Sequence, residues 1–315
     1  MFGQVLGLFP GISDVTDLII NDYEISLGSI QVINDAINDF KGVYDALISG
    51  NTSPTTISKF INAVGRIAGI PTKNILDNIY MPLRLFSPET ALKMKNMFYG
   101  YSGNQISNFI KTYADRKQPD RLSAAIEVKM ENNGFKVPEN VADEMARLYI
   151  VNDNDNIMPK TFGNSLNVNG EKVDITNKVQ KQLYQVYNMA NEQMELLLDR
   201  SYYLNLTDEE KAYAIQKLYD AYYELAKSSV FDGYTATKLG SIANYIDVGK
   251  FACILAKTSE MKATSTTTRK DQVVSYINSQ RLSKAEKFLA LELSGYSLNE
   301  ENQNLVTQYL SAQSA

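Results

Sequence analysis

Histidine does not occur anywhere in the 315-residue sequence. Its absence excludes Ser-His-Asp and Cys-His nucleophiles, together with the histidine-ligated metal sites of most zinc enzymes. Phosphate-binding loops are missing as well. There is no G-x-G-x-x-G motif, and the segment from Gly240 to Gly249-Lys250-Phe251 departs from the P-loop in its spacing and in lacking Ser or Thr after the lysine. We therefore predict no nucleotide hydrolysis, no cofactor and no metal site.

Cysteine occurs once, so the chain cannot form an internal disulfide. Cys253 lies inside the apolar run Phe251-Ala-Cys-Ile-Leu255, at a position that looks like the interior of a helix. Buried thiols in apolar surroundings are unreactive. We predict that Cys253 is buried and takes no part in chemistry.

Long apolar runs are also lacking. No stretch reaches the roughly 18 to 20 uncharged apolar residues of a membrane-spanning helix. The N-terminus lacks the basic head of a secretory signal. We expect no transmembrane segment and no signal peptide.

A calcium loop begins at Asp153 and Asp155 but does not continue. Its sixth position is Met158 where a glycine is needed, and its twelfth is Asn164 where a bidentate glutamate is needed. The sequence argues against calcium binding here.

What is present is helical periodicity. Ile30, Ile33, Ile37 and Phe40 recur at spacings of three and four, which places them on one helix face. Proline just inside a helix start recurs at Ser87-Pro88, Gln118-Pro119 and Val137-Pro138, and Asn133-Gly134 reads as a helix stop. Helices are predicted over 29–49, 55–69, 71–86, 88–98, 104–117, 119–132, 138–150, 177–203, 208–228 and 236–258.

One β-hairpin is predicted near 165–176. Leu166, Val168, Val173 and Ile175 alternate with polar residues around Asn169-Gly170, a pair that suits a two-residue type I′ turn. The change of pattern at this point predicts a domain boundary.

Helix caps predict the organisation of the second half. Thr207-Asp-Glu-Glu210 forms a capping box, and Thr268, Ser283 and Ser297 look like three successive helix starts. The fold class is therefore mostly α, with multi-helix bundle units, one hairpin and a small C-terminal three-helix module. We predict a helical domain over 1–150, a hairpin and long-helix domain over 151–258, and a linker with the three-helix module over 259–315.

Carboxylate pairs can catalyse glycoside hydrolysis without histidine. Glu127, Glu131, Asp143 and Glu144 are the candidates, on adjoining predicted helices. The alternative is that they are ordinary solvated helix faces, as most charged residues are.

Tyrosines concentrate on the two long helices. Eight of them lie between Tyr184 and Tyr223. They can form a stacking surface for bases or a partner, or they can pack in the core. The lack of interleaved arginines favours packing.

Charge is unevenly distributed along an acidic chain of pI about 5.1. Residues 1–58 hold seven acidic residues and one lysine, whereas residues 59–129 hold eleven basic and five acidic residues. The candidate polyanion-binding residues are Lys111, Arg116, Lys117, Arg121 and Lys129. Because the overall field opposes polyanions, and Asp115 and Asp120 can neutralise the cluster by pairing with it, any such binding is expected to be weak and salt-sensitive.

Several short segments carry a resemblance through their order. They are Phe9-Pro-Gly-Ile-Ser-Asp14, Ile70-Pro-Thr-Lys-Asn-Ile75, the hairpin Val168 to Thr176 after Pro159, Leu206-Thr-Asp-Glu-Glu-Lys211 through Ala226-Lys227, and Val274-Ser-Tyr-Ile-Asn-Ser279 to Gly295-Tyr296-Ser297. Together they resemble a region of the large polyvalent proteins of phages and integrated elements, near or after their helical polyvalent protein-associated domains. No enzymatic domain accompanies these segments, so no activity is carried over.

The resemblance implies a phage or prophage origin and a protein that is packaged inside the virion and released with the genome. Its expected location is the virion or the host cytoplasm. The sequence favours a non-enzymatic structural and interaction protein with protein partners or a homo-oligomeric state. An accessory nucleic-acid-binding protein using residues 59–129 and a carboxylate-only cell-wall glycosidase are the alternatives.

Overall fold

The computed structural model describes residues 88–153, 157–263 and 267–314, and the chain divides into two compact units, Met1–Gln105 and Ile106–Ala315. The described part is 69% helical, with a two-stranded antiparallel hairpin, so the predicted mostly α fold is confirmed. Helices predicted over 29–49, 55–69 and 71–86 lie outside the described residues. The boundaries predicted after residues 150 and 258 both fall inside the second unit and stay predictions.

No helix in the described ranges has the length and apolar character needed to cross a bilayer.

The described part of the first unit is mainly one helix. This helix, α6 (Pro88–Tyr99), begins at the predicted proline. It ends at Gly100, whose φ of 61° is left-handed, and the Asn96 side chain accepts a hydrogen bond from the Tyr101 N–H at 3.0 Å. The sequence therefore sets both ends of α6.

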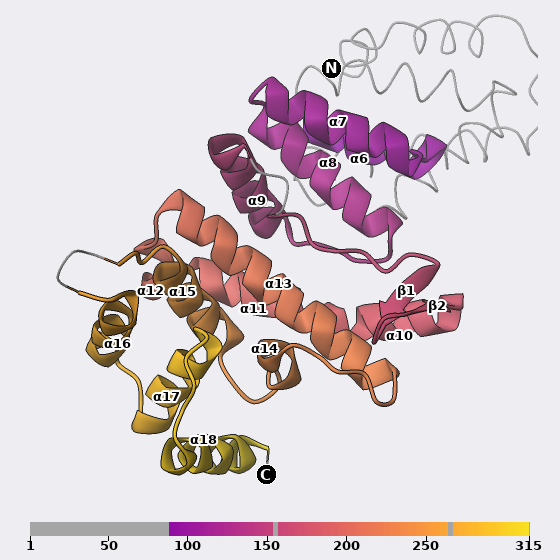
Figure 1. Ribbon diagram of the computed structural model, residues 1–315. Helices are drawn as coiled ribbons and strands as arrows, with labels where there is room; N and C mark the ends of the chain where they lie inside the picture. The colour runs from indigo at the N-terminus through magenta and orange to yellow at the C-terminus, as the bar shows by residue number, and fades with distance from the viewer. Residues whose placement is uncertain (1–87, 154–156, 264–266, 315) are drawn as a thin grey trace, which may run out of the picture. The chain divides into compact units, whose positions relative to one another are not determined.

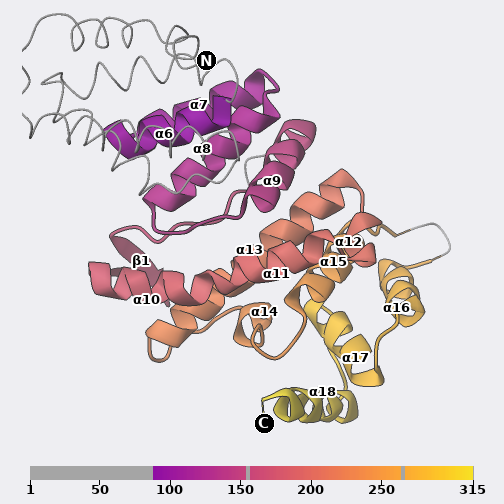
Figure 2. The ribbon, with the colours of Figure 1, turned by 180° about the vertical axis from the view of Figure 1, so that it is seen from behind.

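The second unit is built around one long helix, α13 (Asp208–Val230) (Figures 1 and 2). The helices that pack against it are α9 (Glu139–Asn152), α10 (Asn177–Tyr187), α11 (Met189–Leu198), α14 (Lys238–Ser241) and α15 (Val248–Ser259). Its predicted stripe of Ile215, Leu218, Tyr222 and Leu225 is buried. The capping box of Thr207 and Glu210 starts the helix as predicted.

Two predicted helices are broken in the structure. The helix predicted over 177–203 consists of α10, α11 and the short α12 (Ser201–Leu204), because Asn188 and then Asp199-Arg200 interrupt it. The one predicted over 236–258 consists of α14 and α15, because the Asp247 carboxylate accepts a hydrogen bond from the Lys250 N–H at 2.9 Å and so begins a new helix. At Asp247 a polar side chain with a local hydrogen bond therefore overrides the continuous periodicity.

Three helices lie between α6 and the hairpin in sequence. They are α7 (Gly103–Asp115), α8 (Pro119–Asn132) and α9, of which α8 and α9 pack together. Pro119 is the first residue of α8 as predicted, but Pro138 is the N-cap of α9 rather than its first residue. Gly134 stops α8 with a φ of 83°. A capping box of Ser102 and Gln105 at the start of α7 was not predicted.

The hairpin pairs β1 (Ser165–Val168) with β2 (Glu171–Asp174), in the register that aligns Val168 with Glu171. Its turn residues Asn169 and Gly170 have φ of 53° and 94°, as a type I′ turn requires. The Asn169 side chain donates to the Gly233 carbonyl at 2.8 Å and accepts from the Thr235 N–H at 2.9 Å. The tip of the hairpin is thereby fixed to the loop that follows α13.

Aromatic side chains fill the space between α10, α13 and the segment before β1. Phe162 stacks on Tyr223 at 4.6 Å between ring centroids, and Tyr187 stacks on Phe135 at 4.4 Å. Of the eight tyrosines between 184 and 223, the buried ones are Tyr184, Tyr187, Tyr203, Tyr219 and Tyr222. The packing interpretation of these tyrosines is confirmed.

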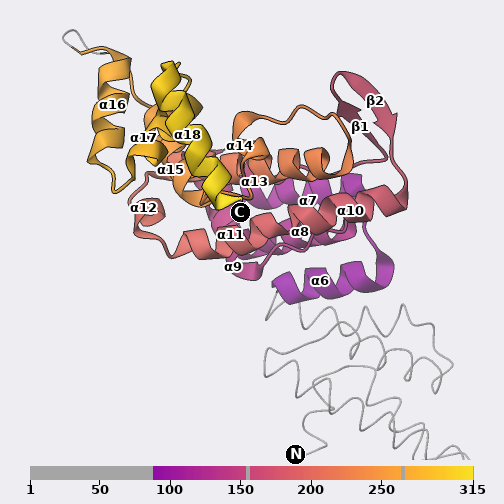
Figure 3. The ribbon, with the colours of Figure 1, turned by 90° about the horizontal axis from the view of Figure 1, so that it is seen from below.

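The chain ends with α16 (Arg269–Ser279), α17 (Lys284–Leu293) and α18 (Glu300–Gln313), which lie at the end of α13 away from the hairpin (Figure 3). Thr268 and Ser283 cap the first two as predicted. The cap predicted at Ser297 is wrong, because Asn299 accepts from the Asn302 N–H at 2.9 Å and starts α18. Both α16 and α17 also contact α15, so their apolar faces are buried partly outside the three helices.

Candidate functional site

The predicted polyanion-binding residues are spread along α7, α8 and the turn between them. Residues 116–118 form that turn, in which the Gln118 N–H donates to the Tyr113 carbonyl at 2.9 Å and the Lys117 N–H donates to the Ala114 carbonyl at 2.9 Å. This is a Schellman motif, and Lys117 occupies its left-handed position with a φ of 52°. The turn therefore presents Arg116 and Lys117 to solvent, where both are exposed.

Lys111 and Arg121 lie within about one helical turn of the Schellman motif on either side, whereas Lys129 does not. Arg121 and Lys129 are eight positions apart in α8, a rise of about 12 Å. The structure thus brings Lys111, Arg116, Lys117 and Arg121 to one end of the two helices. We call these four residues the basic turn.

The acidic neighbours do not pair with the basic turn. Asp115 and Asp120 are exposed, and within the described ranges neither forms an ion pair with a lysine or arginine. The one side-chain hydrogen bond of the turn runs from Arg121 Nη1 to Gln118 Oε1 at 3.4 Å. The predicted neutralisation by direct pairing is therefore absent from this part of the molecule.

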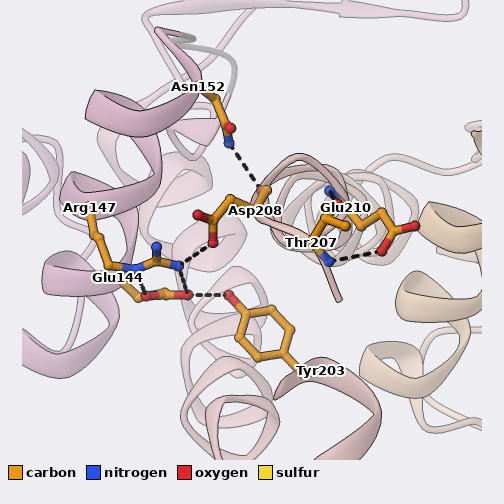
Figure 4. Close-up of polar contacts among 7 residues, drawn as sticks. All are labelled: Glu144, Arg147, Asn152, Tyr203, Thr207, Asp208 and Glu210. Carbon is orange, nitrogen blue, oxygen red and sulfur yellow. Dashed lines mark hydrogen bonds and ion pairs between the residues drawn. The ribbon is translucent and has the colours of Figure 1, made fainter. Parts of the chain in front are cut away.

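A second polar cluster joins α9 to α12 and α13 (Figure 4). Arg147 donates from Nε to Glu144 at 2.8 Å and from Nη2 to both Glu144 at 3.0 Å and Asp208 at 2.9 Å. The Tyr203 hydroxyl donates to Glu144 at 2.9 Å, and the Asn152 amide donates to the Asp208 carbonyl at 3.0 Å. We call these five residues the α9–α13 network.

The network fixes the charge state of its members. Hydrogen bonding to Glu144, and then to Asp208, raises the pKa of Arg147. The hydrogen bond from Arg147 lowers the pKa of the Asp208 carboxyl, although burial opposes that shift. Burial first, and then the charge of Glu144, raises the pKa of Tyr203. Arg147 is held as a cation, Asp208 as an anion and Tyr203 as a neutral hydrogen-bond donor.

Glu144 and Asp208 both accept hydrogen bonds from Nη2 of Arg147, so their carboxylate oxygens lie within about 6 Å of each other. This is close to the separation used by retaining glycosidases. A glycosidase, however, needs one carboxyl with a raised pKa to act as the general acid. The pKa of Asp208 is lowered, and Arg147 occupies the space between the two carboxylates. The arrangement suits an ion-pair link between helices better than acid catalysis.

The four candidate carboxylates of the sequence do not form one group around Glu144. Asp143 is exposed and accepts a hydrogen bond from the Ser123 hydroxyl of α8 at 2.6 Å. Glu131 is exposed at the end of α8, and Glu127 is half-buried. Sequence reasoning missed Tyr203 and Arg147, which donate to Glu144, and Asp208, which accepts from the same arginine. Only the capping box beside Asp208 marked that part of the chain as structured.

The remaining candidates for chemistry are placed as follows. Cys253 is buried as predicted, and burial raises the pKa of its thiol. Asp155 of the calcium-like loop lies outside the described residues. No group of three or more carboxylate and thiol side chains suited to a metal ion occurs in the described ranges.

Comparison of the chain with protein-family models, with curated proteins and with solved structures finds no match.

Proposed function

We propose that the chain is a non-enzymatic structural and interaction protein of phage or prophage origin, carried inside the virion and delivered with the genome. The observation that supports the non-enzymatic part is the α9–α13 network. Its carboxylates, Glu144 and Asp208, share one guanidinium that links α9 to α13, and Glu144 also accepts a hydrogen bond from Tyr203 of α12. The phage origin rests on the ordered resemblance to large polyvalent proteins.

A mass-spectrometric inventory of purified virions tests the proposal. Particles produced by the phage or induced prophage that encodes the chain are banded on a density gradient and treated with protease before digestion. We expect peptides from the whole chain to survive this treatment at several copies per particle. Recovery of those peptides from the cell lysate alone would contradict packaging.

The partners in this proposal are other proteins or further copies of the chain. Chemical cross-linking of the same particles, before they are opened, identifies them. Cross-links between lysines of this chain and an internal virion protein, or between two copies, are the expected result. Cross-links within single copies only would contradict an interaction role in the particle.

A second candidate function is accessory nucleic-acid binding by the basic turn. The observation that favours it is that, among the described residues, none of the four basic side chains forms an ion pair with Asp115, Asp120 or another carboxylate, so their charge is available to phosphates. The acidic chain as a whole still opposes long-range attraction. Binding should therefore be weak and confined to low salt.

The salt dependence of DNA binding tests this second candidate. Replacing Arg116, Lys117 and Arg121 by glutamine should flatten the slope of log affinity against log salt, because each phosphate contact contributes close to one unit to it. Lys129→Gln is the matched control, since it removes one charge about 12 Å away on α8. A slope that the triple substitution leaves unchanged would show that the basic turn is not the site.

A further inference from the structure

A third polar cluster lies at the C-terminal end of α13, and neither proposed function uses it. The side chain of Lys227 is only 9% exposed, and its Nζ lies 2.6 Å from the hydroxyl of Tyr234. That hydroxyl donates to Oε2 of Glu224 at 2.7 Å, and Oε1 of Glu224 is 4.0 Å from Nζ. An amine, a phenol and a carboxylate thus form one hydrogen-bonded chain.

Two aromatic rings lie beside this amine, and a second lysine contacts one of the same rings. Nζ of Lys227 lies 4.1 Å from the ring centroid of Tyr234 and 5.6 Å from that of Tyr223. Nζ of Lys160 lies 5.6 Å from the centroid of the same Tyr223 ring and pairs with Asp220 at 2.8 Å. Desolvation and a nearby cation are the two circumstances that make a lysine nucleophilic.

The electrostatics act in the same direction. Burial lowers the pKa of Lys227, the charge of Glu224 opposes that shift, and the charge of Lys160, which has a smaller effect than Glu224, lowers the pKa. Burial, and then Glu224, raises the pKa of Tyr234. Lys227 therefore loses its proton more readily than an ordinary lysine, and Tyr234 stays protonated and able to donate.

We propose that Lys227 is a nucleophilic lysine that forms an imine with a small aldehyde or ketone. The amine, the proton relay and the second cation are each in place, from positions 160, 224, 227 and 234. The low exposure of the side chain limits the reactant to a small carbonyl compound. The inference is independent of the proposed function, since it concerns a reactive site and requires no turnover.

The reaction balances without an oxidant or reductant. Glu224 takes a proton from the Lys227 ammonium through the Tyr234 hydroxyl. The free amine then attacks the carbonyl carbon, so that a C–N bond forms and the π electrons of the C=O bond move to oxygen. The nitrogen of the adduct then passes one proton to the oxygen, which gives a carbinolamine. Glu224 returns its proton through Tyr234 to the carbinolamine hydroxyl, the C–O bond breaks to release water, and the nitrogen lone pair forms the C=N bond of a protonated imine.

Reductive trapping tests the proposal on the full chain. The protein is treated with acetaldehyde and cyanoborohydride at neutral pH, and ethylation at each lysine is followed by peptide mass spectrometry. We expect Lys227 to react about tenfold faster than the exposed Lys136 and Lys172 of the same chain, and to keep reacting at a lower pH than they do. If Lys227 is instead the slowest, as its burial alone requires, the proposal is wrong.

Variants separate a relay from simple packing. Tyr234→Phe keeps the ring and removes the hydroxyl, so it should slow the ethylation of Lys227 and leave the other lysines unchanged. A merely structural hydroxyl gives the opposite result, because its loss frees the amine and labelling of Lys227 speeds up. Glu224→Gln is the second variant and should slow Lys227 as well, and a circular-dichroism melt confirms that each variant is folded.

Discussion

The α9–α13 network and the basic turn contain the same kinds of side chain, arginine near aspartate, in opposite circumstances. In the network Arg147 is bonded to Glu144 and Asp208, and the Glu144 side chain is only 17% exposed. At the turn Arg116 and Asp115 are adjacent in sequence, yet both are exposed and form no ion pair within the described ranges. Closeness in sequence therefore does not decide which charges pair in this protein.

The difference is explained by packing. Arg147 and Asp208 are 61 positions apart, and they meet because α9 packs against α13. Once the helices have buried their apolar faces, a hydrogen bond between the two side chains costs little further ordering. Residues at an exposed turn gain little from pairing in water, so they remain free to contact phosphates.

The largest expected difference between the two regions is in the free energy of unfolding that is lost when the arginine of each region is replaced. Arg147→Met leaves Glu144 and Asp208 without their shared donor and should lower the free energy of unfolding by about 2 kcal/mol. The partial exposure of these side chains keeps the loss below that of a fully buried pair. Arg116→Met should change stability by no more than about 0.5 kcal/mol. Urea denaturation measures both, and equal losses would remove the distinction.

Two helix ends sharpen the contrast between the packed and exposed parts. Gly134 and Lys117 occupy the same left-handed position after α8 and α7, with φ of 83° and 52°. A left-handed conformation costs a non-glycine residue about 1–2 kcal/mol. Gly134→Ala should therefore lower the free energy of unfolding by about 1 kcal/mol. Lys117→Gly should leave the free energy of unfolding unchanged or raise it by about 0.5 kcal/mol. A thermal melt in which Lys117→Gly is the more harmful change would show that the lysine has a structural contact.

Acid should lower the stability that the α9–α13 network contributes, by less than the substitutions above do. The folded pKa of Asp208 is lowered by Arg147, so its contribution to stability is complete above the unfolded pKa of about 3.9 and is lost as pH falls through the lower folded value. Arg147→Met should flatten the pH dependence of the unfolding midpoint below about pH 4, whereas Asp120→Asn at the exposed turn should not alter it. If the unfolding midpoint of Arg147→Met falls with acid as steeply as that of the wild type, Arg147 does not lower the pKa of Asp208 and the account of the network is contradicted.

Local chemistry made much of the fold predictable. Pro88, Pro119, Thr207 and Gly134 set helix ends through their own backbone or side chain, and Asn169-Gly170 set the hairpin turn. The break at Asn188 was missed because asparagine is compatible with a helix and its φ and ψ of −60° and −20° stay close to helical values. The cap was predicted at Ser297 and lies at Asn299, and residue type alone does not separate the two because serine and asparagine cap helices about equally well.

The sites were less predictable, because they depend on tertiary packing. The basic residues of the basic turn are neighbours in sequence, so four of the five residues predicted to bind polyanions lie close together in the structure. The α9–α13 network joins segments whose apposition no local pattern encodes, and so does the contact of Lys160 with the Tyr223 ring beside Lys227. Tyr203 and Tyr234, for example, have no distinguishing neighbours in the sequence.

The central claim is that Glu144 and Asp208 link helices and do not catalyse hydrolysis. The most direct test measures whether the purified full chain releases soluble fragments from dye-labelled peptidoglycan. We predict release no greater than that of a buffer blank, for the wild type and for Glu144→Gln and Asp208→Asn alike, while both variants lower the unfolding midpoint. Release by the wild type that Glu144→Gln abolishes, with an unfolding midpoint left unchanged, would contradict the account and identify Glu144 as catalytic.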